Sequence, residues 1–299
     1  MVPIMAVDIA FIAVNYNTRA LVEELIRFFA ACELPFRHCL VVVDNSSTDG
    51  SREMLEQAQG DGLVYIQANE NLGYGRGMNR GMAAVASRYA CVMNTDLILN
   101  RDALVALWEF FESRPEAGVA SPVILGSDGR MQGFLSFPGL LLLYAPTLSK
   151  IKSKLWKLRV AKARVPLRVP GVLGAFFMVR RSCFAAPLFD EDFFFYYEDT
   201  ELAHRYWEQG VPCYVLPQVS IVHTGGQSTS AAGGKLFQQS RRIYIEKCYG
   251  APHTAWLAAL DRARLRMKYY KYRILSRFVK NGKIQRKYEY YARLVQPDD

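Results

Sequence analysis

The chain has 299 residues, 51% of them hydrophobic, and a net charge of +9. Its six cysteines form no CxxC pair, which argues against a zinc site and is typical of a reducing cytosol. The N-terminus lacks a basic stretch followed by a long apolar core, and the apolar run at residues 140–143 is far shorter than the ~20 residues that span a bilayer, so we expect neither a secretory signal nor a transmembrane helix.

The first part of the chain alternates short apolar runs with helical patterns, which predicts a mainly parallel α/β sheet covered by helices on both faces. We expect strands at residues 8–14, 39–43, 63–68 and 90–93, and helices at residues 18–31, 49–59, 75–87 and 101–113. Later strands are expected at 119–122, 175–179, 213–216 and 220–223. From residue 235 onward the pattern is helical.

Two segments carry most of the positive charge. Residues 262–293 hold twelve Lys and Arg side chains against the single acid Glu289, and residues 150–168 hold eight and no acid. The rest of the chain is therefore acidic. Basic attachments of this kind favour contact with a polyanion or an anionic surface.

Polar side chains follow each of the first four expected strands. They are Asn15, Tyr16 and Asn17, then the turn at 44–50, then residues 69–73, and finally Asn94, Thr95 and Asp96. Each turn alone has an ordinary explanation, because Asn, Asp, Ser and Gly are common turn and cap residues. Ligands of open parallel sheets bind beyond the carboxyl ends of the strands, so four polar turns at one edge predict a nucleotide site.

The glycines of the chain do not favour a dinucleotide-binding site. That site needs glycines in the first strand-to-helix turn, and this turn has none. Gly73, Gly75, Gly77 and Gly81 follow the third strand instead, where we expect tight helix packing and one close backbone approach to a ligand.

Five consecutive aromatic residues, 193–197, lead directly into Glu198 and Asp199. A poorly hydrated aromatic wall raises the pKa of a carboxylate, while a helix N-terminus lowers it, and the balance suits a general base. The structural alternative is that Asp199 caps a helix at residues 200–209 that ends before Gly210.

Several ordered motifs carry a resemblance to a known family. They are residues 14–17, 42–50, 71–79, 94–96 and 189–199, within a match that covers about residues 8–249. The chain resembles the inverting family 2 glycosyltransferases, with their Rossmann-like, A-type nucleotide-diphospho-sugar transferase fold. Among them it looks most like bacterial rhamnosyltransferase-type enzymes of surface polysaccharide synthesis.

The resemblance implies a domain plan. Residues 1–250 would form the catalytic domain, with a nucleotide-binding half at 1–115 and an acceptor-binding half at 116–250 that contains a basic insert at 140–168. Residues 251–299 would form a helical basic extension.

The resemblance also implies a donor site for a UDP- or dTDP-sugar. Tyr16 would lie against the base and Asp44 would accept its imide N–H. Asp96 would bind Mg²⁺ or Mn²⁺ on the diphosphate, with His223 as a further ligand or as a simply hydrogen-bonded residue. Asn94 stands where the family usually has the first Asp of a D-x-D motif, which makes metal dependence less certain than the nucleotide site. The remaining donor-binding positions would be Asn15, Asn17, Gly73, Asn79 and Thr95.

For catalysis, the resemblance implies that Asp199 is the general base and that Glu198 orients the acceptor or raises the pKa of Asp199. Residues 171–177 would line the donor sugar and the acceptor, with Gly174 bringing the backbone close.

The basic, tyrosine-rich tail favours peripheral attachment to the inner face of the cell membrane, with a lipid-linked saccharide as acceptor. A solvated helix folded back on the domain explains the same tyrosines, and nucleic acid is not expected as a partner. A catalytically inactive sugar-nucleotide or polysaccharide-binding scaffold at the membrane is the alternative function.

Overall fold

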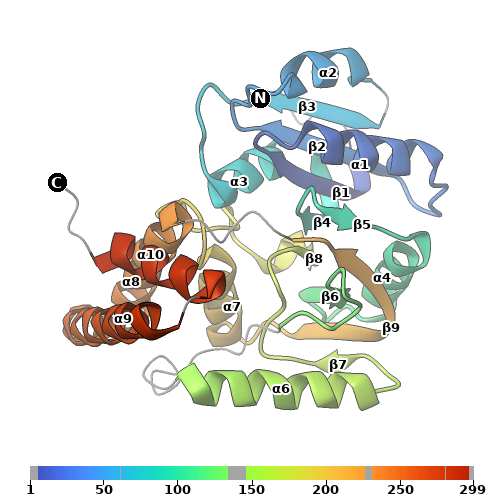
Figure 1. Ribbon diagram of the computed structural model, residues 1–299. Coiled ribbons are helices and arrows are strands. Elements are labelled where there is room, and N and C mark those ends of the chain that lie inside the picture. Colours follow the sequence, from blue (N-terminus) through green and yellow to red (C-terminus); the bar gives the residue numbers. More distant parts are fainter. Residues whose placement is uncertain (1–5, 61, 134–145, 226–230, 280, 296–299) are drawn as a thin grey trace. The chain divides into compact units, whose positions relative to one another are not determined.

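The computed structural model describes residues 6–60, 62–133, 146–225, 231–279 and 281–295 (Figure 1). The apolar run at 140–143 lies outside the described residues. The chain divides into two compact units, one of Met1–Phe194 with Glu198–Gly225 and one of Phe195–Tyr197 with Gly226–Asp299. This division by compactness falls near residue 225, whereas the sequence pattern suggests a change at residue 250.

The first unit contains a mixed sheet with nine strands in the described part of the chain. Its first four strands are β1 (Ala6–Asn15), β2 (His38–Asp44), β3 (Leu63–Gln67) and β4 (Ala86–Met93). They pair in parallel in the order β3-β2-β1-β4. The expected parallel sheet is therefore confirmed in this half.

The second half of the sheet is mixed. Its strands are β5 (Leu97–Ile98), β6 (Val119–Leu125), β7 (Leu167–Arg168), β8 (Phe176–Arg180) and β9 (Cys213–His223). β8 lies between β4 and β6 and runs antiparallel to both, whereas β6 and β9 pair in parallel. β5 and β7 pair antiparallel with β9.

Helices bury apolar side chains against both faces of this sheet. The helices of the unit are α1 (Arg19–Ala31), α2 (Ser51–Ala58), α3 (Tyr74–Ala84), α4 (Arg101–Ser113), α6 (Pro146–Lys162) and α7 (Glu198–Glu208). β1 contributes to both cores: Phe11 belongs to the cluster that includes residues of α1 and α4, and its neighbour Ile12 belongs to the cluster that includes residues of α3 and α7. Alternate residues of a strand point to opposite faces, so the continuous apolar run of β1 feeds two cores.

Two expected boundaries differ from the structure, and two short strands were not expected. The two strands expected at 213–216 and 220–223 are one strand, β9, whose register against β6 shifts between Pro122 and Val123. α3 ends at Ala84 rather than at residue 87, because β4 already begins at Ala86, where it pairs with the start of β1. The two-residue strands β5 and β7 were missed because they are too short to show a period.

The second unit is helical, as expected. It contains α8 (Ala231–Tyr249), α9 (Ala251–Phe278) and α10 (Gly282–Val295). Two pairs of stacked tyrosines, Tyr269 with Tyr288 and Tyr272 with Tyr291, join α9 to α10, with ring centroids 5.8 and 5.5 Å apart. These four tyrosines thus serve the packing of α9 against α10. No helix in the described parts of the chain is both long and apolar enough to cross a membrane.

Candidate active site

The polar turns meet at one edge of the sheet, as the sequence predicts. In the parallel register, Asn15 lies beside Asp44 and Asp44 lies beside Gln67. Asn15 donates its side-chain amide to Asp44 Oδ1 at 2.7 Å, and Gln67 donates to Asp44 Oδ2 at 3.2 Å. The ends of β1, β2 and β3 therefore form one hydrogen-bonded cluster.

Asp44 is fully buried at the centre of this cluster. Besides the amides of Asn15 and Gln67, it accepts hydrogen bonds from the backbone N–H of Ser47 at 3.1 Å and from the Ser47 hydroxyl at 2.5 Å. A carboxylate has about four acceptor positions, so its capacity is filled. For Asp44 to accept the imide N–H of a nucleobase directly, one of these donors would have to move away.

The outer part of the cluster is more open. Tyr16 is 51% exposed and makes no hydrogen bond or ring contact with the described residues, so its ring is available for stacking. Asn17, with φ of 56°, accepts the backbone N–H of Thr48 at 2.7 Å. Thr95 is buried and contacts Thr18 through their hydroxyl groups, 3.1 Å apart. Asn17 and Thr95 thus shape the turns at this edge.

A second cluster joins the end of β4 to the end of β9. His223 Nε2 lies 3.2 Å from Asp96 Oδ1 and 3.2 Å from the Asn94 side-chain nitrogen. The pairing of Leu97 with His223 in the β5–β9 ladder brings these residues together. The resemblance implies that Asp96 and His223 bind the same metal ion, and the structure places the two side chains in contact.

Gln132 fixes the imidazole of His223 and was missed by sequence reasoning. Its Oε1 lies 2.7 Å from His223 Nδ1, and its Nε2 donates to the His223 carbonyl at 2.9 Å. Because Nδ1 donates to this oxygen, the ring is held with Nε2 toward Asp96. Gln132 is 91 residues away in the chain, so no local pattern could reveal it.

These residues fit a divalent cation that is completed by substrate oxygens. Burial raises the pKa of Asp96, but the hydrogen bond and charge of His223 and backbone N–H groups outweigh it, so the pKa is lowered and the carboxylate is ionised. The described residues contain no group of three or more His, Cys, Asp or Glu side chains around one point. Asp96 and His223 could therefore supply two ligands, and a diphosphate and water would supply the rest.

The third cluster surrounds Glu198 and Asp199, which lie in the first turn of α7, as expected of carboxylates at a helix N-terminus. The structural alternative, in which Asp199 caps a helix at residues 200–209, is wrong, because the helix already begins at Glu198. The backbone N–H of Gly174 donates to Asp199 Oδ2 at 3.0 Å. A Cβ on Gly174 would lie 2.7 Å from that oxygen, so only glycine fits there. The close backbone approach expected of Gly174 is thus made to Asp199.

Both carboxylates of this cluster have raised pKa values. Burial raises the pKa of Glu198 to about 8, and the charge of Asp199 adds to the shift. Burial also raises the pKa of Asp199, against hydrogen bonds from Gly174 and Thr200. Glu198 is 7% exposed, and its Oε2 has no hydrogen-bond partner. At neutral pH Glu198 therefore keeps its proton, whereas the donors around Asp199 favour the charged form of that carboxylate against the effect of burial.

Tyr74 and Gly73 lie beside the third cluster, and sequence reasoning missed Tyr74. Tyr74 donates its hydroxyl to the Gly174 carbonyl at 3.0 Å, and its pKa is raised well above the usual value by burial and by the charges of Glu198, Asp199 and Asp96. Gly73 has φ of 80°, and a Cβ there would lie 2.2 Å from the Phe194 carbonyl oxygen. The close approach expected of Gly73 is thus made to backbone.

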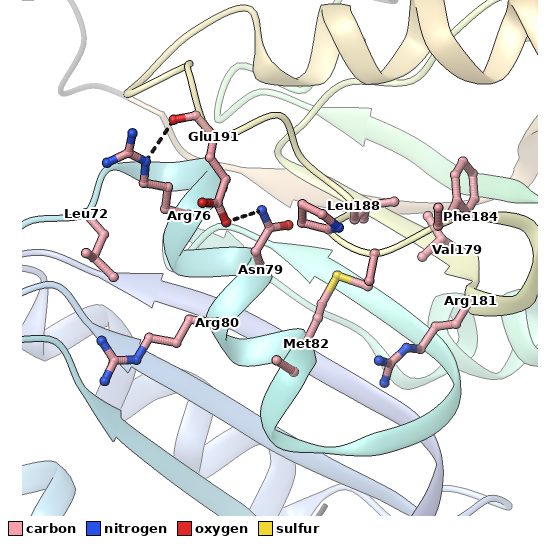
Figure 2. A pocket seen from close by; sticks show the side chains of 14 residues that line it. Leu72, Arg76, Asn79, Arg80, Met82, Val179, Arg181, Phe184, Leu188 and Glu191 are labelled. Carbon is pink, nitrogen blue, oxygen red and sulfur yellow. Dashed lines mark hydrogen bonds between the residues drawn. The ribbon is translucent and has the colours of Figure 1, made fainter. Parts of the chain in front are cut away.

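Among the described residues, the side chain of Asn79 makes no hydrogen bond with the three clusters. Its amide donates to the Phe189 carbonyl at 2.8 Å and to Glu191 Oε1 at 3.1 Å, and its oxygen accepts the Phe189 N–H at 2.9 Å. Figure 2 shows Asn79 pointing toward Glu191, within a cavity beside α3. These contacts hold residues 189–191 against α3, and they give no support to donor binding by Asn79.

Comparison with known proteins places this arrangement in a family. The sequence profile of glycosyl transferase family 2 matches residues 11–185, more than half of the chain. A poly-β-1,6-N-acetyl-D-glucosamine synthase of Staphylococcus epidermidis is 20% identical over 113 residues, which are 38% of this chain. The match spans 27% of that relative's length.

Solved structures show the same fold. The mannosyltransferase PcManGT of Pyrobaculum calidifontis, in complex with GDP-Man and Mn²⁺, has a TM-score of 0.58 at 16% identity, covering 98% of this chain and 86% of its own. TarS residues 1–349 of S. aureus, in complex with UDP, have a TM-score of 0.54 at 16% identity, covering 84% and 69%. The fold is thus the A-type glycosyltransferase fold, and the chain belongs to glycosyl transferase family 2.

Proposed function

We propose that the protein transfers a sugar from a UDP- or dTDP-sugar to a saccharide hydroxyl group in bacterial cell-surface polysaccharide synthesis. Family membership supports glycosyl transfer, and the S. epidermidis synthase is a relative that makes such a polymer. The TarS complex with UDP supports a pyrimidine nucleotide as donor, while the PcManGT complex with GDP-Man keeps a purine as a competitor to test. Rhamnose is the sugar that the resemblance of the sequence favours.

The observation that carries the proposal is the buried carboxylate pair. Asp199 takes the proton of the acceptor hydroxyl as that oxygen attacks the anomeric carbon, and the nucleoside diphosphate leaves from the opposite side. This single displacement inverts the anomeric centre. Because Glu198 is protonated, it places no second negative charge beside Asp199. The site then holds a single carboxylate charge in poorly hydrated surroundings.

Asp96 and His223 would hold a divalent cation, which supplies charge neutralisation on the leaving diphosphate. The Mn²⁺ in the PcManGT complex supports this assignment. Tyr16 would stack on the base beyond β1, where its ring is exposed. Asn15, Ser47 and Gln67 would hold the base edge of the site in place through Asp44.

The test is the Asp199→Asn variant. We expect transfer to fall by ~10²–10⁴, because a positioned base is lost while the side chain keeps its shape. Thermal stabilisation by UDP or dTDP with Mn²⁺ should stay as in the wild type. Turnover at the wild-type rate would refute the assignment of Asp199, and stabilisation by GDP alone would refute the pyrimidine donor.

We also propose that α9 attaches the protein to an anionic membrane surface, which makes a lipid-linked acceptor accessible. Met267, Tyr270, Ile274 and Phe278 recur every three or four residues and are 64%, 54%, 55% and 81% exposed. They therefore form an apolar stripe along one face of a highly basic helix.

The membrane proposal predicts binding to vesicles of phosphatidylglycerol and phosphatidylcholine that weakens as salt increases. In the wild type, the apolar side chains of Ile274 and Phe278 would enter the membrane interface. The double variant Ile274→Glu with Phe278→Glu replaces them with carboxylates and should lose most of this binding. Vesicles of phosphatidylcholine alone are the control for charge. Equal binding by the double variant and the wild type would refute the role of the stripe.

A further inference from the structure

A cavity of about 590 Å³ lies beside α3, apart from the three clusters above. Its walls are the outer face of α3, the end of β8 and the segment from Phe184 to Glu191 (Figure 2). The lining includes neither Asp96 nor the carboxylates of α7, and the proposed transfer reaction leaves the cavity unused. Its volume lies in the range of small-molecule sites.

Positive charge dominates the polar part of this cavity. Arg76, Arg80 and Arg181 line it, against the single acid Glu191. Glu191 accepts a hydrogen bond from Asn79, and its carbonyl accepts one from Arg76 Nε at 2.8 Å, but no described ion pair joins its carboxylate to an arginine. The cavity therefore has an excess of cationic groups over acids.

Two of these arginines have no acidic partner among the described residues. Arg181 is half-buried and donates only to neutral acceptors, the Val85 carbonyl at 2.6 Å and the Ser87 hydroxyl at 3.2 Å. Burial lowers its pKa, although a guanidinium stays charged. Arg80 makes no hydrogen bond or ion pair with any described residue. An anion that enters the cavity could form a charged hydrogen bond with a guanidinium group that has no acidic partner, and it would stabilise that positive charge.

The rest of the lining is apolar. In Figure 2, Arg76 and Arg80 lie toward one end of the cavity and Arg181 toward the other, with Met82 and Leu188 between them. The ring of Phe184 lies on the side of Arg181. An inorganic anion would leave this apolar surface in water, and a neutral hydrocarbon would leave the arginines without a partner.

We propose that this cavity binds an amphiphilic phosphate, that is, a phosphate ester of an apolar chain. The phosphate group would accept hydrogen bonds from Arg80, and the chain would cover Met82, Phe184 and Leu188. The proposal commits to a lipid-like phosphate rather than free phosphate, because both the charge and the apolar surface need a partner. It goes beyond the transfer reaction and does not depend on it.

The experiment measures binding of dodecyl phosphate, inorganic phosphate and dodecyl maltoside by titration calorimetry, with both detergents below their critical micelle concentrations. We expect dodecyl phosphate to bind the full-length wild type and the other two to bind at least tenfold more weakly. Arg80→Gln should weaken dodecyl phosphate about tenfold, because one charged hydrogen bond is lost. Arg80 is exposed, so this variant should fold normally.

Two further variants decide the interpretation. Arg52→Gln removes one exposed charge on α2 and should leave binding unchanged. Met82→Glu places a carboxylate among the apolar residues and should also weaken binding. Equal binding of dodecyl maltoside, equal binding of inorganic phosphate, or an Arg80→Gln variant that binds like Arg52→Gln would each overturn the proposal.

Discussion

Asp44 and Glu198 are both buried acids of the same unit, but their surroundings are opposite. Asp44 accepts four hydrogen bonds and joins the ends of three strands. Glu198 has an oxygen without a partner and a pKa raised to about 8. A carboxylate whose acceptor positions are all filled stabilises the fold. A buried carboxyl oxygen without a donor is unfavourable, and such groups with shifted pKa values are common in reactive sites. The sheet edge thus holds its shape through filled hydrogen bonds, whereas the start of α7 keeps an acid in unfavourable surroundings, as reactive sites often do.

The largest effect that would sharpen this contrast comes from Gly174→Ala. The added Cβ meets Asp199 Oδ2, so the base must move while the sheet edge stays intact. We expect kcat to fall by ~10², since a displacement of about 1 Å can cost that much, with little change in nucleotide binding. Steady-state kinetics and thermal shift with nucleotide measure the two quantities. Unchanged kcat would mean that the Gly174–Asp199 contact does not position the base.

Next in size is Gln132→Leu, which removes the partner of His223 Nδ1. Loss of a residue that orients a metal ligand typically costs 10–100-fold in metal affinity. Calorimetric titration of Mn²⁺ into the protein saturated with nucleoside diphosphate should show this loss. Gln132→Glu keeps an acceptor for Nδ1 and should restore most of the affinity. If Leu and Glu variants bind Mn²⁺ equally well, Gln132 does not orient the imidazole.

Asp44→Asn should affect stability rather than chemistry. The new amide would place a donor against donors, which costs about 1–3 kcal/mol in the free energy of unfolding. Urea denaturation measures this cost, with Asp128→Asn on an exposed loop as the matched control. If Asp44→Asn is as stable as the control, the hydrogen bonds of Asp44 do not stabilise the fold, and the contrast with Glu198 is wrong.

The smallest effect concerns pH. Folded Glu198 keeps its proton up to about pH 8, whereas an ordinary glutamate releases it near pH 4.5. The folded protein therefore binds more protons between these values, and this group makes it less stable as pH rises through them. Glu198→Gln should raise the melting temperature by a few degrees at pH 8 and much less at pH 5. The exposed Glu109→Gln variant should show no such pH dependence. A constant difference across pH would mean that Glu198 titrates normally.

The sequence predicts the parts of the site that follow strands, because strand ends are marked by local patterns. Asn15 and Asp44 meet because neighbouring parallel strands end together, and the raised pKa values of the α7 carboxylates follow from their apolar context. However, Phe194 in the aromatic run is 42% exposed, so this run is not a continuous wall.

Other contacts depend on pairing between distant segments, which no local pattern records. The bond between Gln132 and His223 depends on the packing of β6 beside β9, and the placement of Tyr74 under Gly174 depends on residues 100 apart. The donor role predicted for Asn79 came from motif position alone, whereas its contacts were set by the segment at 189–191.

The insertion of β8 between β4 and β6 also has a consequence for how the protein matures. β1 to β4 pair among themselves, so this half can form soon after it leaves the ribosome, since domains fold from the N-terminus as they are made. β8 must wait until residue 180 is available, and only its arrival brings Gly174 to Asp199. Long-range pairing of this kind is slow. Glu198 and Asp199 are therefore made only after the four parallel strands, and the burial of these carboxylates depends on the later packing of β8 and α7.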